Sequence, residues 1–129
     1  MTDKAGRRVL IVDDAALVRT YYRTALEQGG FLVEEALNGL EALEKLLLYP
    51  FDLAIVDINM PHMDGITFLR TLRSKDIPVS GIPVLITSTE AGPQDMAAAR
   101  SAGANYYLVK PVKQETLAEY AAIFCGAPR

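Results

Sequence analysis

The chain has 129 residues, half of them apolar, which is enough for one domain with a substantial buried core. Thirteen Lys and Arg against sixteen Asp and Glu give a formal net charge of −3, so the composition offers no broad basic surface for a nucleic-acid backbone. No apolar run approaches the roughly 18 residues of a membrane span, and the first residues lack the apolar stretch of a signal peptide. We therefore expect no direct binding to nucleic acid or membrane.

A single cysteine, Cys125, cannot form an internal disulfide and has no neighbouring Cys or His for a metal site. This usage fits a reducing compartment and predicts a cytoplasmic protein. The pattern of apolar segments predicts a short polar leader at 1–7, one domain at 8–125 and a short tail at 126–129.

The first half of the chain alternates short apolar runs with helical patterns. The run RVLIVD at 8–13 predicts a strand covered on both faces, and the spacing of Leu17, Tyr21 and Ala25 predicts a helix at 16–28 that stops at two glycines. FLVEEA at 31–36 predicts a second strand. After Asn38 and Gly39, leucines at positions 40, 43, 46 and 47 predict a second helix that ends at Pro50.

The second half repeats this alternation. Strands are predicted at 52–57, 83–88 and 106–110, and helices at 93–102, at 114–124 and at 66–74, where Phe68, Leu69 and Leu72 face inward. Five strand–helix units in a row predict an α/β fold with a single doubly wound, five-stranded parallel sheet covered by helices on both faces. Such sheets place their active groups beyond the carboxyl ends of the strands.

Polar residues follow four of the predicted strands at that edge. They are Asp13 and Asp14 after the first strand, Asp57 after the third, Ser88 after the fourth and Lys110 after the fifth. Each acid alone is as well explained by helix capping or by solvation, but three carboxylates at one edge repel one another by several kcal/mol per pair at about 4 Å. A cation must compensate them, and hard oxygen ligands suit Mg²⁺, with Mn²⁺ as the alternative.

This set of groups predicts phosphoryl chemistry. An Asp so placed can act as a nucleophile and hold a phosphoryl group as an acyl phosphate, while a metal ion and Lys110 neutralise the charge on the transferring oxygens. The hydroxyl of Ser88 can swing toward the new phosphoryl oxygens, which would turn a covalent event into a movement of the loop behind the fourth strand.

The motifs VDD after the first strand, DINMPHMDG after the third, a hydroxyl after the fourth and YYLVKPV at the fifth occur together in this chain. As a set they resemble the receiver domain of two-component response regulators, including the stand-alone chemotaxis regulators, over residues 8–124. The resemblance implies a flavodoxin-like, CheY-like fold with strand order 2-1-3-4-5 and five helices.

The resemblance also implies roles for individual residues. Asp57 would be the phosphoacceptor, Asp14 would bind the metal directly, Asp13 would act mainly through water and Asn59 would lend its backbone carbonyl. Lys110 would bridge to the phosphoryl group, and the Lys110–Pro111 bond is expected to be cis.

The switch and the lifetime of the phosphoryl group depend on further positions. Tyr107 occupies the family's switch-aromatic position and would turn inward when the hydroxyl of Ser88 moves, although Thr87 is the runner-up for that hydroxyl because this chain reads Thr-Ser-Thr there. Asn59 and Glu90 lie at the two positions that tune hydrolysis, and they match rapidly reversing chemotaxis regulators. A phosphoryl lifetime of seconds to minutes follows.

The resemblance implies a signalling switch that is no enzyme beyond its own phosphorylation and dephosphorylation. A sensor histidine kinase or a histidine phosphotransfer protein would phosphorylate Asp57, and the surface of the fourth helix, fifth strand and fifth helix would change its affinity for a downstream protein target. We expect a monomer or weak homodimer. Met1 with a short polar leader favours a stand-alone regulator over a receiver excised from a hybrid kinase or effector-bearing regulator.

Two other classes fit the residues less well. A phosphatase with an aspartyl-phosphate intermediate would need a second acid where Asn59 stands, and a cap insertion to hold its substrate. A nucleotide-binding domain would need a glycine-rich turn after the first strand, where Asp13 and Asp14 place negative charge instead.

Overall fold

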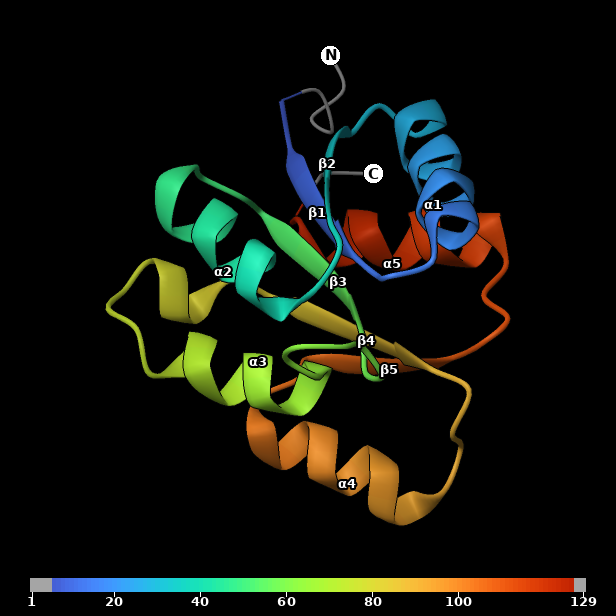
Figure 1. Cartoon of the computed structure of the whole chain (residues 1–129). Coiled ribbons are helices and arrows are strands. Elements are labelled where there is room, and N and C mark those ends of the chain that lie inside the picture. The colour runs from blue at the N-terminus through green and yellow to red at the C-terminus, as the bar shows by residue number, and fades with distance from the viewer. Residues whose placement is uncertain (1–5, 127–129) are drawn as a thin grey trace.

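Strands and helices alternate regularly along the chain in the computed structural model, which describes residues 6–126 (Figure 1). Most of the predicted leader and tail, residues 1–5 and 127–129, lies outside the described residues. The strands are β1 (Arg8–Val12), β2 (Leu32–Ala36), β3 (Leu53–Asp57), β4 (Val84–Ser88) and β5 (Tyr106–Val109). The helices are α1 (Ala16–Gln28), α2 (Gly39–Leu48), α3 (Gly65–Arg73), α4 (Pro93–Ala102) and α5 (Gln114–Phe124), with a short 3₁₀ helix at Val79–Gly81.

The strands form one parallel sheet in the order β2-β1-β3-β4-β5. Ile11 of β1 lies beside Ile55 of β3, and Asp57 at the end of β3 lies beside Thr87 of β4. The chain order therefore reverses between β1 and β3, so a crevice opens at the carboxyl ends of these two strands. The predicted α/β class, strand order and helix count are confirmed.

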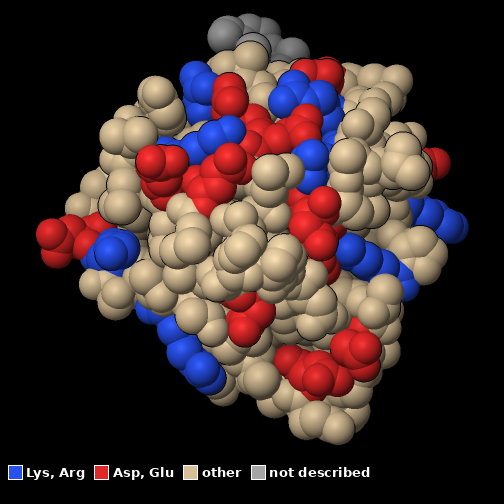
Figure 2. All heavy atoms as spheres, in the orientation of Figure 1, with Lys and Arg blue, Asp and Glu red and all other residues tan. Residues whose placement is uncertain are grey.

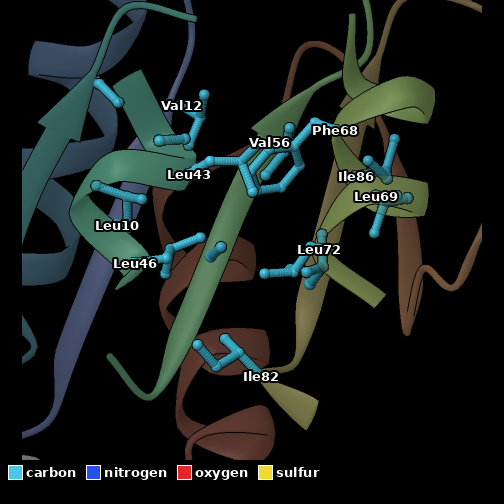
Figure 3. Packing of buried hydrophobic residues seen from close by; sticks show 14 of the residues in the cluster. Leu10, Val12, Leu43, Leu46, Val56, Phe68, Leu69, Leu72, Ile82 and Ile86 are labelled. Atoms are coloured by element: carbon cyan, nitrogen blue, oxygen red, sulfur yellow. The ribbon is translucent and has the colours of Figure 1, made fainter. Parts of the chain in front are cut away.

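Two hydrophobic layers cover the sheet. Helices α2, α3 and α4 pack on one face, where Leu43 and Leu46 of α2, Phe68 and Leu72 of α3 and Val56 of β3 belong to one buried cluster (Figure 3). Helices α1 and α5 cover the other face. Every residue of β3 and β4 is buried, which explains why these strands read as continuous apolar runs rather than as alternating ones.

Local sequence signals set the ends of several helices. The side chain of Asn38 accepts a hydrogen bond from the Glu41 N–H at the start of α2, and Asp64 accepts one from the Thr67 N–H at the start of α3. Helix α4 stops at Gly103, whose φ of 114° is left-handed backbone that favours glycine.

The inward face of α1 differs from the spacing noted in the sequence. Leu17 and Tyr21 are exposed, whereas Tyr22, Ala25 and Leu26 are buried. The leucines of α2 also divide, because Leu43 and Leu46 are buried while Leu40 and Leu47 face solvent. The 3₁₀ helix between α3 and β4 was not predicted, since its three residues, Val79–Gly81, carry no helical periodicity.

Charges of both signs lie intermixed over much of the face shown in Figure 2. Several of them are paired: Glu35 forms ion pairs with Arg19 at 2.8 Å and with Arg23 at 2.6 Å, and Arg8 lies 3.6 Å from Glu34. Within residues 6–126, no helix is long and apolar enough to cross a bilayer.

Candidate functional site

Three carboxylates meet where β1 and β3 end. Asp13 and Asp14 follow β1 and Asp57 ends β3, and one carboxylate oxygen from each lies within 4.8 Å of the others. Asp13 is 1% exposed and Asp57 7% exposed, while Asp14 faces solvent. The sequence-predicted acids are therefore brought together in a pocket that is buried on one side and open on the other.

The loop between β1 and α1 fixes Asp13 in this pocket. Its Oδ1 accepts a hydrogen bond from the Ala15 N–H at 2.9 Å, and its backbone carbonyl accepts one from Arg19 Nη1 at 2.7 Å. Arg19 is held in turn by Glu35. The sequence predicted no role for Arg19. The pattern that could have indicated one is a long cationic side chain in the first turn of the helix that follows two acidic residues.

Lys110 supplies the positive charge of the pocket. Its Nζ lies 3.0 Å from Asp13 Oδ2 and 3.2 Å from Asp57 Oδ1. Burial pulls the pKa of Lys110 down, but the two carboxylates outweigh burial and raise it above its ordinary value. The ammonium group is therefore charged and bridges the two buried acids.

One ammonium group does not compensate both buried carboxylates fully. Burial and the neighbouring Asp13 carboxylate raise the pKa of Asp57, while Lys110 and the backbone N–H of Asn59 oppose the rise without cancelling it. The pocket thus retains an excess of negative charge that a second cation would relieve. Its three carboxylates, Asp13, Asp14 and Asp57, fit a hard divalent ion such as Mg²⁺.

The turn after β3 brings the backbone close behind Asp57. A Cβ at Gly65 would lie 2.8 Å from the Asp57 carbonyl oxygen and 2.8 Å from Ile58 Cα, so only glycine fits there. The Gly65 N–H donates to the Ile58 carbonyl at 2.9 Å. His62 is exposed and takes a φ of 70° in this turn. The DG pair therefore lets α3 start immediately beside the site, with Asp64 as its cap.

A chain of hydrogen bonds runs from the site along the loop between β4 and α4. The Lys110 N–H donates to the Ser88 carbonyl at 2.7 Å, and Ser88 Oγ accepts from the Glu90 N–H at 3.0 Å. The hydroxyl of Tyr107 donates to the Glu90 carbonyl at 2.8 Å. Ser88 is fully buried and Tyr107 is half-buried, so both candidate switch residues contact the same loop residue.

The other predicted site residues lie around this core. Asn59 and Glu90 have exposed side chains. The Lys110–Pro111 peptide bond is cis. Thr87, the alternative switch hydroxyl, is fully buried beside Asp57, and its Oγ1 lacks a hydrogen-bond partner within residues 6–126.

Comparison with known proteins places the chain in a family. The model of the response regulator receiver domain matches residues 9–122. The chain is 36% identical over 110 residues to the two-component response regulator PhoP of Pseudomonas aeruginosa, covering 85% of this chain and 48% of that protein. It is 32% identical over 111 residues to the CAI-1 autoinducer sensor kinase/phosphatase CqsS of Vibrio cholerae, covering 86% of this chain and 16% of that protein.

The fold has close relatives among solved structures. The chemotaxis protein CheY4 of Vibrio cholerae superposes with a TM-score of 0.86 at 35% identity, covering 93% of this chain and 99% of that one. The chain spans less than half the length of the curated relatives named above. The matched family model and the CheY-like fold agree with the motifs around Asp57 and Lys110, and the chain belongs to the response regulator receiver domain family, whose members are signalling switches of two-component systems.

Proposed function

We propose that this chain is a phosphorylation-dependent signalling switch in which Asp57 accepts a phosphoryl group. The observation that supports this most is the pair of contacts at Lys110 Nζ, 3.2 Å from Asp57 and 3.0 Å from Asp13, inside a pocket with a third acid. A purely structural ion pair would need only one carboxylate beside the Lys110 ammonium group. A pocket with three carboxylates around one ammonium group is suited to a dianionic phosphoryl group with its metal ion.

In the proposed reaction, an oxygen of the Asp57 carboxylate attacks phosphorus. The bond from phosphorus to the imidazole nitrogen of a donor phosphohistidine breaks, and its electrons leave with that nitrogen. With a small donor such as acetyl phosphate, the phosphorus–oxygen bond breaks and acetate leaves. Lys110 neutralises charge on the phosphoryl oxygens, and Asp13, Asp14, Asp57 and the Asn59 carbonyl would hold Mg²⁺, which supplies further charge neutralisation when bound.

The readout would start at Ser88. The Ser88 hydroxyl accepts a hydrogen bond from the Glu90 N–H, and the Glu90 carbonyl accepts one from the Tyr107 hydroxyl. A phosphoryl group on Asp57 would compete for the Ser88 hydroxyl, shift the loop and release Tyr107 to turn inward. The surface of α4, β5 and α5 would then change its affinity for a downstream protein.

The donor in this proposal is a sensor histidine kinase or a histidine phosphotransfer protein, and the site of action is the cytoplasm. We propose a stand-alone regulator, a monomer or weak homodimer. The alternative is a receiver that forms part of a hybrid kinase or of a regulator with an effector domain, since PhoP and CqsS, the two curated relatives named above, are longer than the chain.

The test is labelling by radioactive acetyl phosphate with Mg²⁺. Asp57→Asn should abolish labelling, because an amide is a poor nucleophile and cannot form the acyl phosphate. Asp64→Asn is the matched control: this exposed acid lies seven residues further along the same segment, and Asn caps α3 as well as Asp does. Labelling of the Asp57→Asn variant at the wild-type rate would show that another side chain is the acceptor.

Decay of the label tests the proposed hydrolysis role of Asn59 and Glu90. Both side chains are exposed, and the proposal places them beside the phosphoryl group. Loss of the label within seconds to minutes is expected after the donor is removed. A label that persists for many hours would contradict this part of the proposal.

A further inference from the structure

The short loop between β1 and α1 carries two of the three acids of the pocket. The N-cap of α1 is Ala15, which has no side chain that could cap the helix. Asp14 is exposed, so the direction of its carboxylate depends on the backbone of the loop. Metal ligands are usually held in place by hydrogen bonds from neighbouring groups, and for this loop such groups come from α1 and β2.

The backbone of Asp13 is held by hydrogen bonds on both sides. Its N–H donates to the Ala36 carbonyl at the end of β2 at 3.2 Å, and its carbonyl accepts from Arg19 Nη1 at 2.7 Å. Arg19 lies in the first turn of α1, and its side chain is only 12% exposed. The guanidinium group is therefore a fixed donor to the loop rather than a solvated surface charge.

Glu35 of β2 orients this guanidinium group. Its Oε1 accepts from Arg19 Nε at 2.8 Å, and its Oε2 accepts from Arg23 Nε at 2.6 Å. Burial would raise the pKa of Glu35, but hydrogen bonds from the two arginines outweigh burial and lower it. The carboxylate is therefore charged. Arg19 thus donates to β2 and to the loop at once, which the planar guanidinium group allows because its donors are fixed relative to one another.

We propose that Arg19 and Glu35 are positioning residues for the acidic pair: Glu35 orients the guanidinium group of Arg19, and Arg19 holds the Asp13 carbonyl so that the carboxylates of Asp13 and Asp14 stay beside Asp57. Neither Arg19 nor Glu35 is a ligand in the proposed metal site. This inference rests on the proposed function, because it concerns the Mg²⁺ ion that the phosphorylation of Asp57 would use.

The test is the Kd for Mg²⁺ of the unphosphorylated chain, measured by isothermal titration calorimetry. We expect Arg19→Gln to raise the Kd about tenfold, as is typical when a group that orients a metal ligand is lost. The direction is informative, because loss of a positive charge near an acidic site would by itself strengthen the binding of a divalent cation. Weaker binding would therefore report the geometry of the loop rather than its charge.

Arg23→Gln is the matched control. It removes the same charge from the same helix, one turn further along, and it also removes a hydrogen bond to Glu35, but the contacts of Arg23 are with Glu35 and Glu27 rather than with the loop. We expect its Kd to stay within about twofold of the wild-type value.

Arg19→Lys is a second variant that keeps the charge and changes only the geometry of the donors. We expect it to weaken Mg²⁺ binding in the same direction as Arg19→Gln but by less, and it still tests the inference if Arg19→Gln does not fold. Circular dichroism of each variant checks that the fold is retained.

A double-mutant cycle tests whether Glu35 acts through Arg19. Glu35→Ala should weaken Mg²⁺ binding in the wild-type background, because it leaves the guanidinium group without its orienting partner. In the Arg19→Gln background the same substitution should change the Kd by less than about 1.5-fold. An equal effect in both backgrounds would remove Glu35 from the inference.

The outcomes separate this inference from the proposed function. If the wild type binds no Mg²⁺, the metal site of the proposed function fails and this inference fails with it. If the wild type binds Mg²⁺ and takes the label from acetyl phosphate, but Arg19→Gln binds the ion as tightly or more tightly, the positioning role alone is wrong. An equal loss of affinity in Arg23→Gln would assign the effect to the ion pairs of α1 in general, and would also overturn the inference.

Discussion

The negative charge of Asp57 lowers the stability of the folded chain. Burial and Asp13 raise its pKa in the folded chain above the ordinary value of 3.8, in spite of Lys110. The folded chain therefore binds this proton more tightly than the unfolded chain does. As the pH rises through the raised pKa, the carboxylate ionises in a site that disfavours it, and stability is lost. Such unrelieved charge is typical of functional groups rather than of structural ion pairs.

Neutralising Asp57 should therefore stabilise the protein. Without divalent ions, we expect Asp57→Asn to raise the free energy of unfolding at pH 7 by about 1 kcal/mol. The advantage should shrink as the pH falls through the raised pKa and vanish below 3.8, where Asp57 is protonated in both states. Urea denaturation at a series of pH values measures this difference.

Adding Mg²⁺ to the same urea denaturation experiment should make the wild type more stable than the Asp57→Asn variant. An ion at one hundred times its Kd stabilises the folded state by about 2.7 kcal/mol, and the wild type, with all three acids, should gain more than the Asn variant. Lower stability of Asp57→Asn at pH 7 in the absence of Mg²⁺ would contradict the charge excess inferred here.

At the scale of elements, the turn between β3 and α3 shapes the site. Gly65 lets the backbone pass within contact distance of Asp57, and Asp64 caps the helix that starts there. The turn therefore packs closely against the end of the strand that carries Asp57. Any side chain at Gly65 would push α3 away from the end of β3.

We expect Gly65→Ala to destabilise the fold by about 1–3 kcal/mol, because its methyl group would lie 2.8 Å from two backbone atoms. Gly81→Ala is the control, since a Cβ there meets no atom within 4 Å and should change the unfolding free energy by less than about 0.5 kcal/mol. Equal effects of the two substitutions in urea denaturation would show that the close approach at Gly65 does not constrain the turn.

Sequence periodicity predicted most elements well, because their signals are local. The helices at Ala16–Gln28, Pro93–Ala102 and Gln114–Phe124 have the predicted bounds. The inward face of α1 was less predictable, because Leu17 and Tyr21 are apolar but exposed. Their spacing is as regular as that of the buried residues, and only the packing of the helix decides between them.

The candidate site, like the fold, was predicted from the sequence only in part. Convergence of the acids and Lys110 followed from strand ends in a parallel sheet. The role of Arg19 behind Asp13 did not, because its partner Glu35 belongs to β2 and meets Arg19 only through the packing of α1 beside β2.

At the scale of the molecule, the site and the proposed output surface are joined through β5. Lys110 follows β5 directly, and Tyr107 within β5 contacts the loop that carries Ser88 and Glu90. Tyr106 stacks on Tyr120 of α5 with ring centres 4.6 Å apart. One short strand therefore links the pocket to α5 and to the loop before α4, so a change at Asp57 has a physical route to that surface.

The amide NMR spectrum of the nitrogen-labelled chain, recorded during steady-state phosphorylation by excess acetyl phosphate and Mg²⁺, tests the switch most directly. We expect shifts next to Asp57 and also at Ser88, Glu90 and Tyr107, with none when Mg²⁺ is omitted or in the Asp57→Asn variant. Shifts confined to the immediate neighbours of Asp57, or shifts of equal size in the Asn variant, would contradict a phosphorylation switch.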